Sequence, residues 1–221
     1  VYCVSWDSLR KDECKRNVHR LVCLLGNKLN FRWAIEDDCT HLTLIRDMAG
    51  RRMPAYLWSQ EVAQGQSCFE YGREKIRTDA SFAAYFKNWR VGQLESKFVG
   101  AFFGFLVDDP YPDRDLDAVP KCFRPCVELE KVASGAWMLQ AIAILPEYRS
   151  KGLARQLLDE ATRVAAEAGT NRIALQAEEV NSVALRAYTR NGFVEVDRRP
   201  YVHFPGSQDS GDVILMCKKI T

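Results

Sequence analysis

A strand-length apolar segment, a basic loop and an amphipathic segment follow one another in the second half of the chain. The apolar residues 137–145 predict a strand, and residues 152–168 place their apolar side chains at helical spacing up to Gly169. Gly152 lets the loop backbone approach a ligand closely, and the first N–H groups of a helix have no partner within it. This succession predicts a sheet covered by helices, with a loop suited to a phosphate group.

The loop matches neither of two common nucleotide-binding patterns. It lacks Gly-x-x-x-x-Gly-Lys-Ser/Thr, and it lacks Gly-x-Gly-x-x-Gly with an acidic residue about 20 positions further on. Arg149, Lys151 and Arg155 give it positive charge. Taken alone, the loop is more simply explained as a strand–turn–helix crossover with solvated basic side chains, so its interpretation depends on the rest of the chain.

Periodicity and turn residues predict the other elements. Further strands are expected over residues 42–46, 89–95, 97–107, 172–178, 193–202 and 212–219. Further helices are expected over residues 53–63, 80–88 with Asp79 as N-cap, and 181–190 with Asn181 as N-cap. The fold class is therefore α/β (α+β), with a mixed sheet and helices on its faces.

The last of these helices carries a second pattern. Asn181 caps it, Ala184 and Tyr188 lie one turn apart on one face, and Gly192 ends it before Phe193 opens a strand. Tyr188 is thus held in a defined place. Its simplest interpretation is a core aromatic residue whose hydroxyl reaches water.

Together the two patterns resemble the GCN5-related N-acetyltransferase (GNAT) superfamily. Residues Arg149-Ser150-Lys151-Gly152-Leu153-Ala154 are similar to its acetyl-CoA loop, Arg/Gln-x-x-Gly-x-Gly/Ala, although Ser150 and Ala154 stand where glycine is frequent. Residues 181–193 are similar to its Asn-x-x-Ala-x-x-x-Tyr-x-x-x-Gly-Phe signature. Residues 56–60 and 124–130 resemble one uncharacterised bacterial branch of the superfamily.

The resemblance implies a GNAT fold: a central, mostly antiparallel sheet splayed around the cofactor strand and flanked by about four helices. It implies that acetyl-CoA places its pyrophosphate on Arg149, Ser150, Lys151, Gly152, Leu153 and Ala154. The backbone of Ile142 and Ile144 would bind the pantetheine and, near Ile142, polarise the thioester carbonyl. Asn181 would contact the cofactor, and Tyr188 would be the catalytic acid that protonates the departing thiolate.

The implied reaction is direct attack of an amine on the thioester. An alkylammonium group has a pKa near 10.4, so a carboxylate must help to remove its proton. Glu128, Glu130, Glu178 and Glu179 all lie near the expected site, and the sequence does not choose among them. No cysteine falls on either motif, which argues against covalent catalysis.

The acceptor is less defined than the cofactor. Residues 53–80 and the acidic, proline-rich loop 108–117 are expected to border its site, and the charge of that loop suggests a cationic amine. Trp58, Phe69 and Tyr71 line this site or merely pack the helices together. The prediction is an acetyl-CoA-dependent N-acetyltransferase acting on a primary amine of a small molecule or protein. The alternative is a non-catalytic acyl-CoA-binding regulatory module.

The composition limits the partners, the compartment and the metal content that can be expected of the chain. The formal net charge is +2, so the overall balance does not suggest a nucleic-acid partner, and the chain has no apolar run long enough to span a membrane. Its 8 cysteines are too few for a disulfide scaffold, which suggests a cytoplasmic protein. No metal is expected, because the cysteines lack the usual close pairing.

The chain is expected to divide into an N-terminal extension, residues 1–39, and an acetyltransferase domain, residues 40–221. The extension is basic near its start, and Val18, Leu21, Val22 and Leu25 stand at helical spacing. A homodimer is consistent with the family resemblance. A weaker alternative gives the extension a role in binding nucleic acid or protein.

Overall fold

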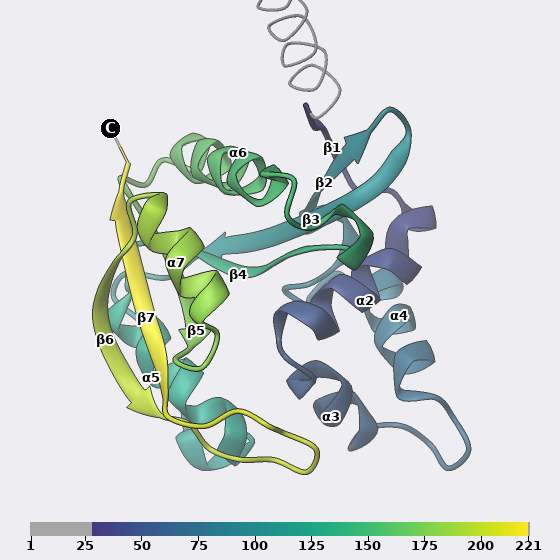
Figure 1. The fold of residues 1–221 in the computed structure, drawn as a ribbon. Coiled ribbons are helices and arrows are strands. Elements are labelled where there is room, and N and C mark those ends of the chain that lie inside the picture. Colours follow the sequence, from purple (N-terminus) through teal and green to yellow (C-terminus); the bar gives the residue numbers. More distant parts are fainter. Residues whose placement is uncertain (1–27, 221) are drawn as a thin grey trace, which may run out of the picture.

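A computed structural model describes residues 28–220 of the chain. The helix expected around Val18–Leu25 lies outside the described residues. Figure 1 shows a central twisted sheet with helices on both of its faces. No helix of the described part is long and apolar enough to cross a membrane.

Seven strands form the sheet in the order β1-β2-β3-β4-β5-β7-β6. They are β1 (Asn30–Trp33), β2 (Trp89–Leu94), β3 (Lys97–Leu106), β4 (Trp137–Ile144), β5 (Arg172–Glu178), β6 (Val194–Pro200) and β7 (Asp212–Lys219). Every neighbouring pair is antiparallel except β4 and β5, which are parallel. The prediction of a mixed, mostly antiparallel sheet is confirmed.

Helices cover both faces of the sheet. They are α2 (Cys39–Ala49), α3 (Met53–Ser59), α4 (Cys68–Thr78), α5 (Arg124–Val132), α6 (Leu153–Glu167) and α7 (Ser182–Arg190). Helices α6 and α7 pack on one face of the sheet. On the opposite face, α2 and α4 lie over β2–β4, and α5 lies near β6 and β7. The described part thus has six α-helices, where the sequence suggested about four.

Apolar periodicity explains the strongest of these elements. Helix α6 buries Leu153, Leu157, Leu158, Ala161 and Ala165, which lie on one face at helical spacing. These side chains pack against the sheet in one cluster. By the usual estimate of 1.5–3 kcal/mol for each large apolar side chain, burying the three leucines contributes roughly 5–9 kcal/mol before entropy is counted. The helix is therefore a rigid support for the loop that precedes it.

The first expected strand is wrong, because residues 42–46 belong to helix α2. Leu42, Thr43 and Ile45 are buried, whereas Leu44 is 43% exposed. A strand would have buried Leu42 and Leu44 together on one face. The helix instead places Leu42 and Ile45 on the sheet, and it projects Arg46 toward the pocket described below.

The helix expected over residues 80–88 is wrong, and the helix of this region, α4, lies before it. Helix α4 begins after Ser67, whose side chain forms a capping box with Glu70, and it ends at Asp79. Asp79 therefore follows a helix instead of starting one, and residues 80–88 contain only turns and a short 3₁₀ segment. The signal for the correct start, Ser-x-x-Glu, was present in the sequence.

Besides α4, two more elements were not expected. Helix α5 begins inside the proline-rich connection, with Pro125 in its first turn, where a missing N–H costs nothing. Strand β1, within the expected N-terminal extension, pairs with β2 at the edge of the sheet. The strand predictions in the second half hold well, since β5 and β7 have the expected bounds.

Candidate active site

The parallel strands β4 and β5 separate part of the way along their length. They pair through Trp137, Met138 and Leu139 only. Beyond that point β4 stays bonded to β3 as far as Ile144, and β5 stays bonded to β7 as far as Glu178. The sheet therefore opens into a V, which we call the splay, and the splay expected around the cofactor strand is confirmed.

A β-bulge lies at the mouth of the splay. Phe103 pairs with Ala141 and Gly104 with Leu139, so Gln140 has no partner on β3. The extra residue shifts the alternation of side chains along β4. As a result Gln140 lines a pocket on the α2 side of the sheet, while Ile142 packs on the α6 side. The bulge thus directs neighbouring residues of one strand to two different sites.

The basic loop lies between β4 and α6. Leu153 is buried and anchors the start of the helix, whereas Arg149, Ser150, Lys151 and Gly152 are exposed. Gly152 is the N-cap of α6, so no side chain caps the helix. A Cβ added to Gly152 would meet nothing within 4 Å. The free N–H groups of the first turn are therefore open to an anion from solvent.

The backbone of this loop is left-handed at two positions. Gly152 has φ 75° and Ser150 has φ 62°. Glycine adopts such angles without penalty, while a residue with a side chain pays roughly 1–2 kcal/mol. Ser150 thus keeps the loop conformation that glycine would adopt, at a cost in backbone strain.

The cationic side chains of the loop also form bonds within the protein. Arg149 donates from Nε to the carbonyl of Ile144 at 3.2 Å, and Lys151 donates from Nζ to the carbonyl of Glu147 at 3.1 Å. The Lys151 ammonium also lies 5.4 Å from the centre of the Tyr148 ring. These bonds hold the loop in shape and keep its positive charge near the helix terminus.

Strand β4 presents backbone groups to the splay. The N–H of Leu145 donates to Val99 of β3, and successive residues of a strand direct their backbone groups to opposite edges. Ile142 and Ile144 therefore direct theirs away from β3, toward the gap left by β5. The Ile144 carbonyl already accepts the bond from Arg149.

The second motif flanks the splay on the α6 side. Asn181 caps α7 by accepting from the N–H of Ala184 at 3.3 Å, as expected, so its side-chain oxygen is already engaged. Tyr188 packs against the α6 cluster and lies 6.0 Å from the ring of Phe193. Burial, and secondly the charge of Glu178, raise the pKa of Tyr188 to about 12. Tyr188 is therefore protonated at neutral pH.

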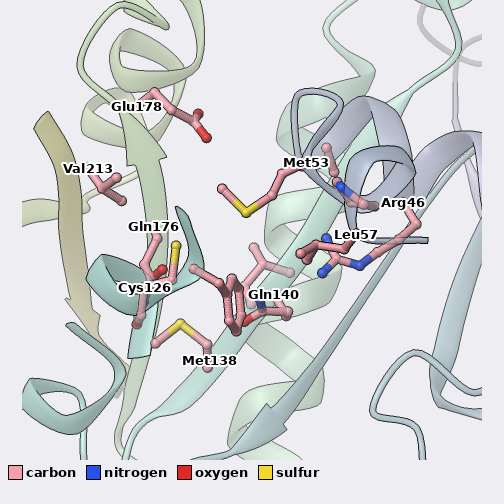
Figure 2. Close-up of a pocket in the computed structure, with 14 residues that line it drawn as sticks. Arg46, Met53, Leu57, Cys126, Met138, Gln140, Gln176, Glu178 and Val213 are labelled. Carbon is pink, nitrogen blue, oxygen red and sulfur yellow. The ribbon is translucent and has the colours of Figure 1, made fainter. Parts of the chain in front are cut away.

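A pocket opens on the opposite face of the sheet, between the helices α2 and α3 and the start of α5 (Figure 2). Its inner wall includes Leu139, Gln140 and Gln176, where β4 and β5 part. The described residues that line it share a mostly apolar character: Arg46, Ala49, Gly50, Met53, Pro54, Leu57, Phe123, Cys126, Met138, Leu139, Gln140, Gln176, Glu178 and Val213. The pocket and the basic loop thus reach the splay from opposite faces.

Of the four candidate bases, Glu178 lines this pocket. Glu128 pairs with Arg199 at 3.0 Å, and Glu130 accepts from the Tyr111 hydroxyl at 3.1 Å. Glu179 pairs with Arg198 at 3.3 Å. None of these three lines the pocket in the described part of the chain. Burial raises the pKa of Glu178, while Arg51, at 3.7 Å, acts in the opposite direction.

The residues expected to border the acceptor site agree with the pocket only in part. Met53, Pro54 and Leu57 line it, but no residue of the acidic loop 108–117 does so within the described chain. Trp58 is 4% exposed and packs edge-on to Phe69 between α3 and α4. Arg46, Gln140, Gln176 and the α5 segment were not foreseen as pocket residues.

Comparison with known proteins identifies the family. The model of the Acetyltransferase (GNAT) family matches residues 65–193, which is more than half of the chain. The chain belongs to the GNAT family. This membership supports acetyl transfer from an acyl-CoA at the level of the family. No match was found among the curated proteins compared.

Several solved structures share the fold at low sequence identity. An N-acetyltransferase from Staphylococcus aureus Mu50 is 14% identical with a TM-score of 0.59, covering 85% of this chain and 99% of its own. Ard1 from Thermoplasma volcanium is 13% identical with a TM-score of 0.52, covering 87% and 98%. The protein yncA from Salmonella typhimurium, whose structure contains its cofactor acetyl-CoA, is 15% identical with a TM-score of 0.51, covering 88% and 95%.

Proposed function

We propose that this GNAT protein transfers an acetyl group from acetyl-CoA to a primary amine of a small molecule or protein, by direct attack in a ternary complex. The observation that carries the proposal is the arrangement around the splay. An open helix N-terminus approaches it from one face of the sheet, and a pocket with a carboxylate approaches it from the other. Two reactants held in this way would meet at the gap between β4 and β5.

The residues present fit acetyl-CoA, which would supply an activated acetyl group as a thioester. The uncapped start of α6 has room at Gly152 for a pyrophosphate, and Arg149 and Lys151 add positive charge there. The backbone of Ile142, directed into the splay, would bind the pantetheine and polarise the thioester carbonyl. Ser150, Leu153 and Ala154 would contribute the shape and the N–H groups of the loop.

Tyr188 would act on the departing thiolate. Because its pKa is raised to about 12, it keeps its proton at neutral pH. A thiol has a pKa of about 8.5, so complete transfer of the proton from Tyr188 would be uphill by roughly 3.5 pKa units. The side chain would therefore stabilise the thiolate chiefly by donating a hydrogen bond, which refines the role of acid expected from the sequence.

Glu178 would accept the proton of the amine. It lines the pocket proposed for the acceptor, and its charge contributes to the raised pKa of Tyr188. Burial raises the pKa of Glu178, which makes it a stronger base than an exposed carboxylate. Asn181 would contact the cofactor through its NH₂ group, since its oxygen caps α7.

Direct attack is favoured over a covalent route. Cys126 lines the pocket, but burial raises its pKa to about 12, so the thiolate needed for nucleophilic attack is scarce at neutral pH. A direct route needs only the base, the hydrogen-bond donor and the placement of the two reactants.

The test combines cofactor binding with turnover. Isothermal titration with acetyl-CoA is expected to show binding that is lost in Arg149→Ala/Gly152→Asp, and release of free CoA thiol is expected with some members of a primary-amine panel. Arg73→Ala, a change at an exposed position of α4, is the control. A folded chain that does not bind acetyl-CoA would overturn the proposal. Binding without release across the panel would favour a regulatory module instead.

A further inference from the structure

Arg46 is the feature of the acceptor pocket that neither the fold nor the proposed chemistry explains. It comes from the last part of α2, and its guanidinium extends into the pocket (Figure 2). The group lies 5.8 Å from the centre of the Phe103 ring. Burial lowers its pKa to about 10, so it still carries its charge at neutral pH.

This charge has no carboxylate partner among the described residues. Its neighbours are engaged elsewhere: Asp47 accepts from the N–H of Ala55 at 3.0 Å and faces Arg52 at 3.5 Å. Arg51, close by in sequence, forms an ion pair with Asp209. The Arg46 side chain has no hydrogen bond or ion pair within residues 28–220. Arg46 is half-buried, so its guanidinium reaches the space of the pocket. An unpaired guanidinium that lines a pocket is suited to bind an anionic group of a ligand.

The charges of the pocket define that ligand further. Arg46 and Glu178 are the charged side chains among the described residues that line it, and they enter from opposite sides, α2 and β5 (Figure 2). Arg46 can bind a negative group of a ligand, and Glu178, which also lies 3.7 Å from Arg51, can bind a positive one. A planar guanidinium binds a carboxylate through two parallel hydrogen bonds, and one arginine balances its single charge.

The uncharged residues of the pocket indicate the chemistry of the rest of the ligand. Met53, Leu57, Phe123 and Met138 give the pocket much of its apolar lining. Gln140 and Gln176 add amide groups at the splay. A carbon skeleton with a carboxylate at one end and an amino group toward the splay would satisfy each part of this lining.

We propose that the acceptor is an amine that also carries a carboxylate, and that Arg46 binds this carboxylate while the amino group faces Glu178. The inference rests on the proposed acetyltransferase function and names its substrate class. It replaces the cationic amine suggested by the acidic loop 108–117, no part of which lines the pocket in the described chain.

Binding of a carboxylate without an amine tests Arg46 independently of turnover. Pentanoate and 3-phenylpropionate are titrated into the wild-type protein and into Arg46→Met, each saturated with CoA. We expect the variant to bind at least one of them roughly ten- to hundred-fold more weakly than the wild type. The affinity of Arg46→Lys should lie between the two, because lysine keeps the positive charge but cannot form the two parallel hydrogen bonds of a guanidinium. Arg73→Met is the control, and it should bind like the wild type.

Turnover then tests the substrate class with matched pairs of amines. Each amino acid is compared with the amine that lacks only its carboxylate: β-alanine with ethylamine, 5-aminopentanoate with butylamine, and phenylalanine with 2-phenylethylamine. The wild type should favour the carboxylate in at least one pair by about ten-fold or more in kcat/KM, and Arg46→Met should reduce that ratio to about one.

The outcomes separate this inference from the proposed function. Acetylation of amines with equal kcat/KM in every pair, or a ratio that Arg46→Met leaves unchanged, would overturn the inference and keep the acetyltransferase. Absence of any turnover would overturn the proposed function, and the binding titration would still decide the role of Arg46. Failure of the wild type to bind either carboxylate would overturn the inference. Thermal melting should show Arg46→Met folded with a melting temperature close to that of the wild type, because the Arg46 side chain is half-buried and has no ion pair or hydrogen bond to lose within residues 28–220.

Discussion

A negative charge introduced at position 152 offers the sharpest test of the cofactor loop. Two variants are compared, Gly152→Asp and Gly152→Asn. The two side chains have nearly the same shape, and both tolerate the left-handed backbone found there, with φ 75°. A Cβ at this position meets no atom within 4 Å, so neither substitution creates a clash. The pair therefore differs in one negative charge beside the expected pyrophosphate.

The size of the effect follows from the exposure of the loop. Two unit charges about 4 Å apart interact by roughly 1 kcal/mol in water and about 4 kcal/mol at an effective dielectric constant of 20. Because Gly152 is exposed, the lower part of this range applies. Gly152→Asp should bind CoA more weakly than Gly152→Asn by about 1–2 kcal/mol, roughly five- to thirty-fold.

Isothermal titration of both variants with CoA measures this difference. Repeating the titration in about 1 M salt should shrink it, since the Debye length falls from about 10 Å at 0.1 M to about 3 Å. Thermal melting should show both variants folded, with a melting temperature only a few degrees below that of the wild type. Equal affinity of the Asp and Asn variants in low salt would refute phosphate binding at the start of α6.

Substitutions at Tyr188, Glu178 and Ser150 test separate parts of the site. Tyr188→Phe should lower kcat about 100-fold and leave the affinity for CoA unchanged, as measured by thiol release and titration. Glu178→Gln should lower kcat/KM about 100-fold and abolish the acid limb of the pH–rate profile, because activity needs the carboxylate ionised. Burial raises the Glu178 pKa, so the stability of the wild type should fall as pH rises through that value, and Glu178→Gln should remove this fall in thermal melts. Ser150→Gly should raise the melting temperature by about 2–4 °C, because glycine relieves roughly 1 kcal/mol of left-handed strain.

Each of these expectations has an outcome that contradicts it. Full activity of Tyr188→Phe would show that another group stabilises the thiolate. An unchanged pH–rate profile in Glu178→Gln would move the base to another residue or to water. For Ser150→Gly, a lower melting temperature would mean that the serine side chain stabilises the loop by more than its backbone strain costs.

The second half of the chain could be predicted well because its periodicity is long and unbroken. The apolar stripe of α6 and the alternation in β5 and β7 leave little choice of structure, and Gly152 and Gly192 mark helix ends. The loop and the position of Tyr188 follow from these elements. The splay follows only from the family resemblance, because the end of strand pairing has no local signature.

The first half was harder because its apolar runs are short. Leu42 and Leu44 are spaced as in a strand, but the residues that are buried are Leu42 and Ile45, which are spaced as in a helix. In so short an apolar segment, only tertiary packing decides between strand and helix. Arg46 was consequently placed on a strand, and its role in the pocket was missed. Pro125 suggested a loop, whereas it lies in the first turn of α5.

Gln140 shows a different limit of sequence reasoning. The bulge that directs Gln140 toward the pocket depends on the register between β3 and β4. No residue type within β4 predicts that register. Glu178 could be selected from the four candidate bases only by seeing which carboxylate lines the pocket and which ones form ion pairs or hydrogen bonds outside it. Such partners lie far apart in sequence, as Glu128 and Arg199 do.

The short pairing of β4 with β5 has a mechanical consequence. Three residue pairs join these strands, whereas seven join β3 to β4 and seven join β5 to β7. The molecule is thus two half-sheets connected by a narrow seam, and a pantetheine arm lying in the gap would act as a substitute strand that extends the seam. Ligand binding should then slow amide hydrogen exchange in the separated ends of β4 and β5 and couple the motions of the two halves.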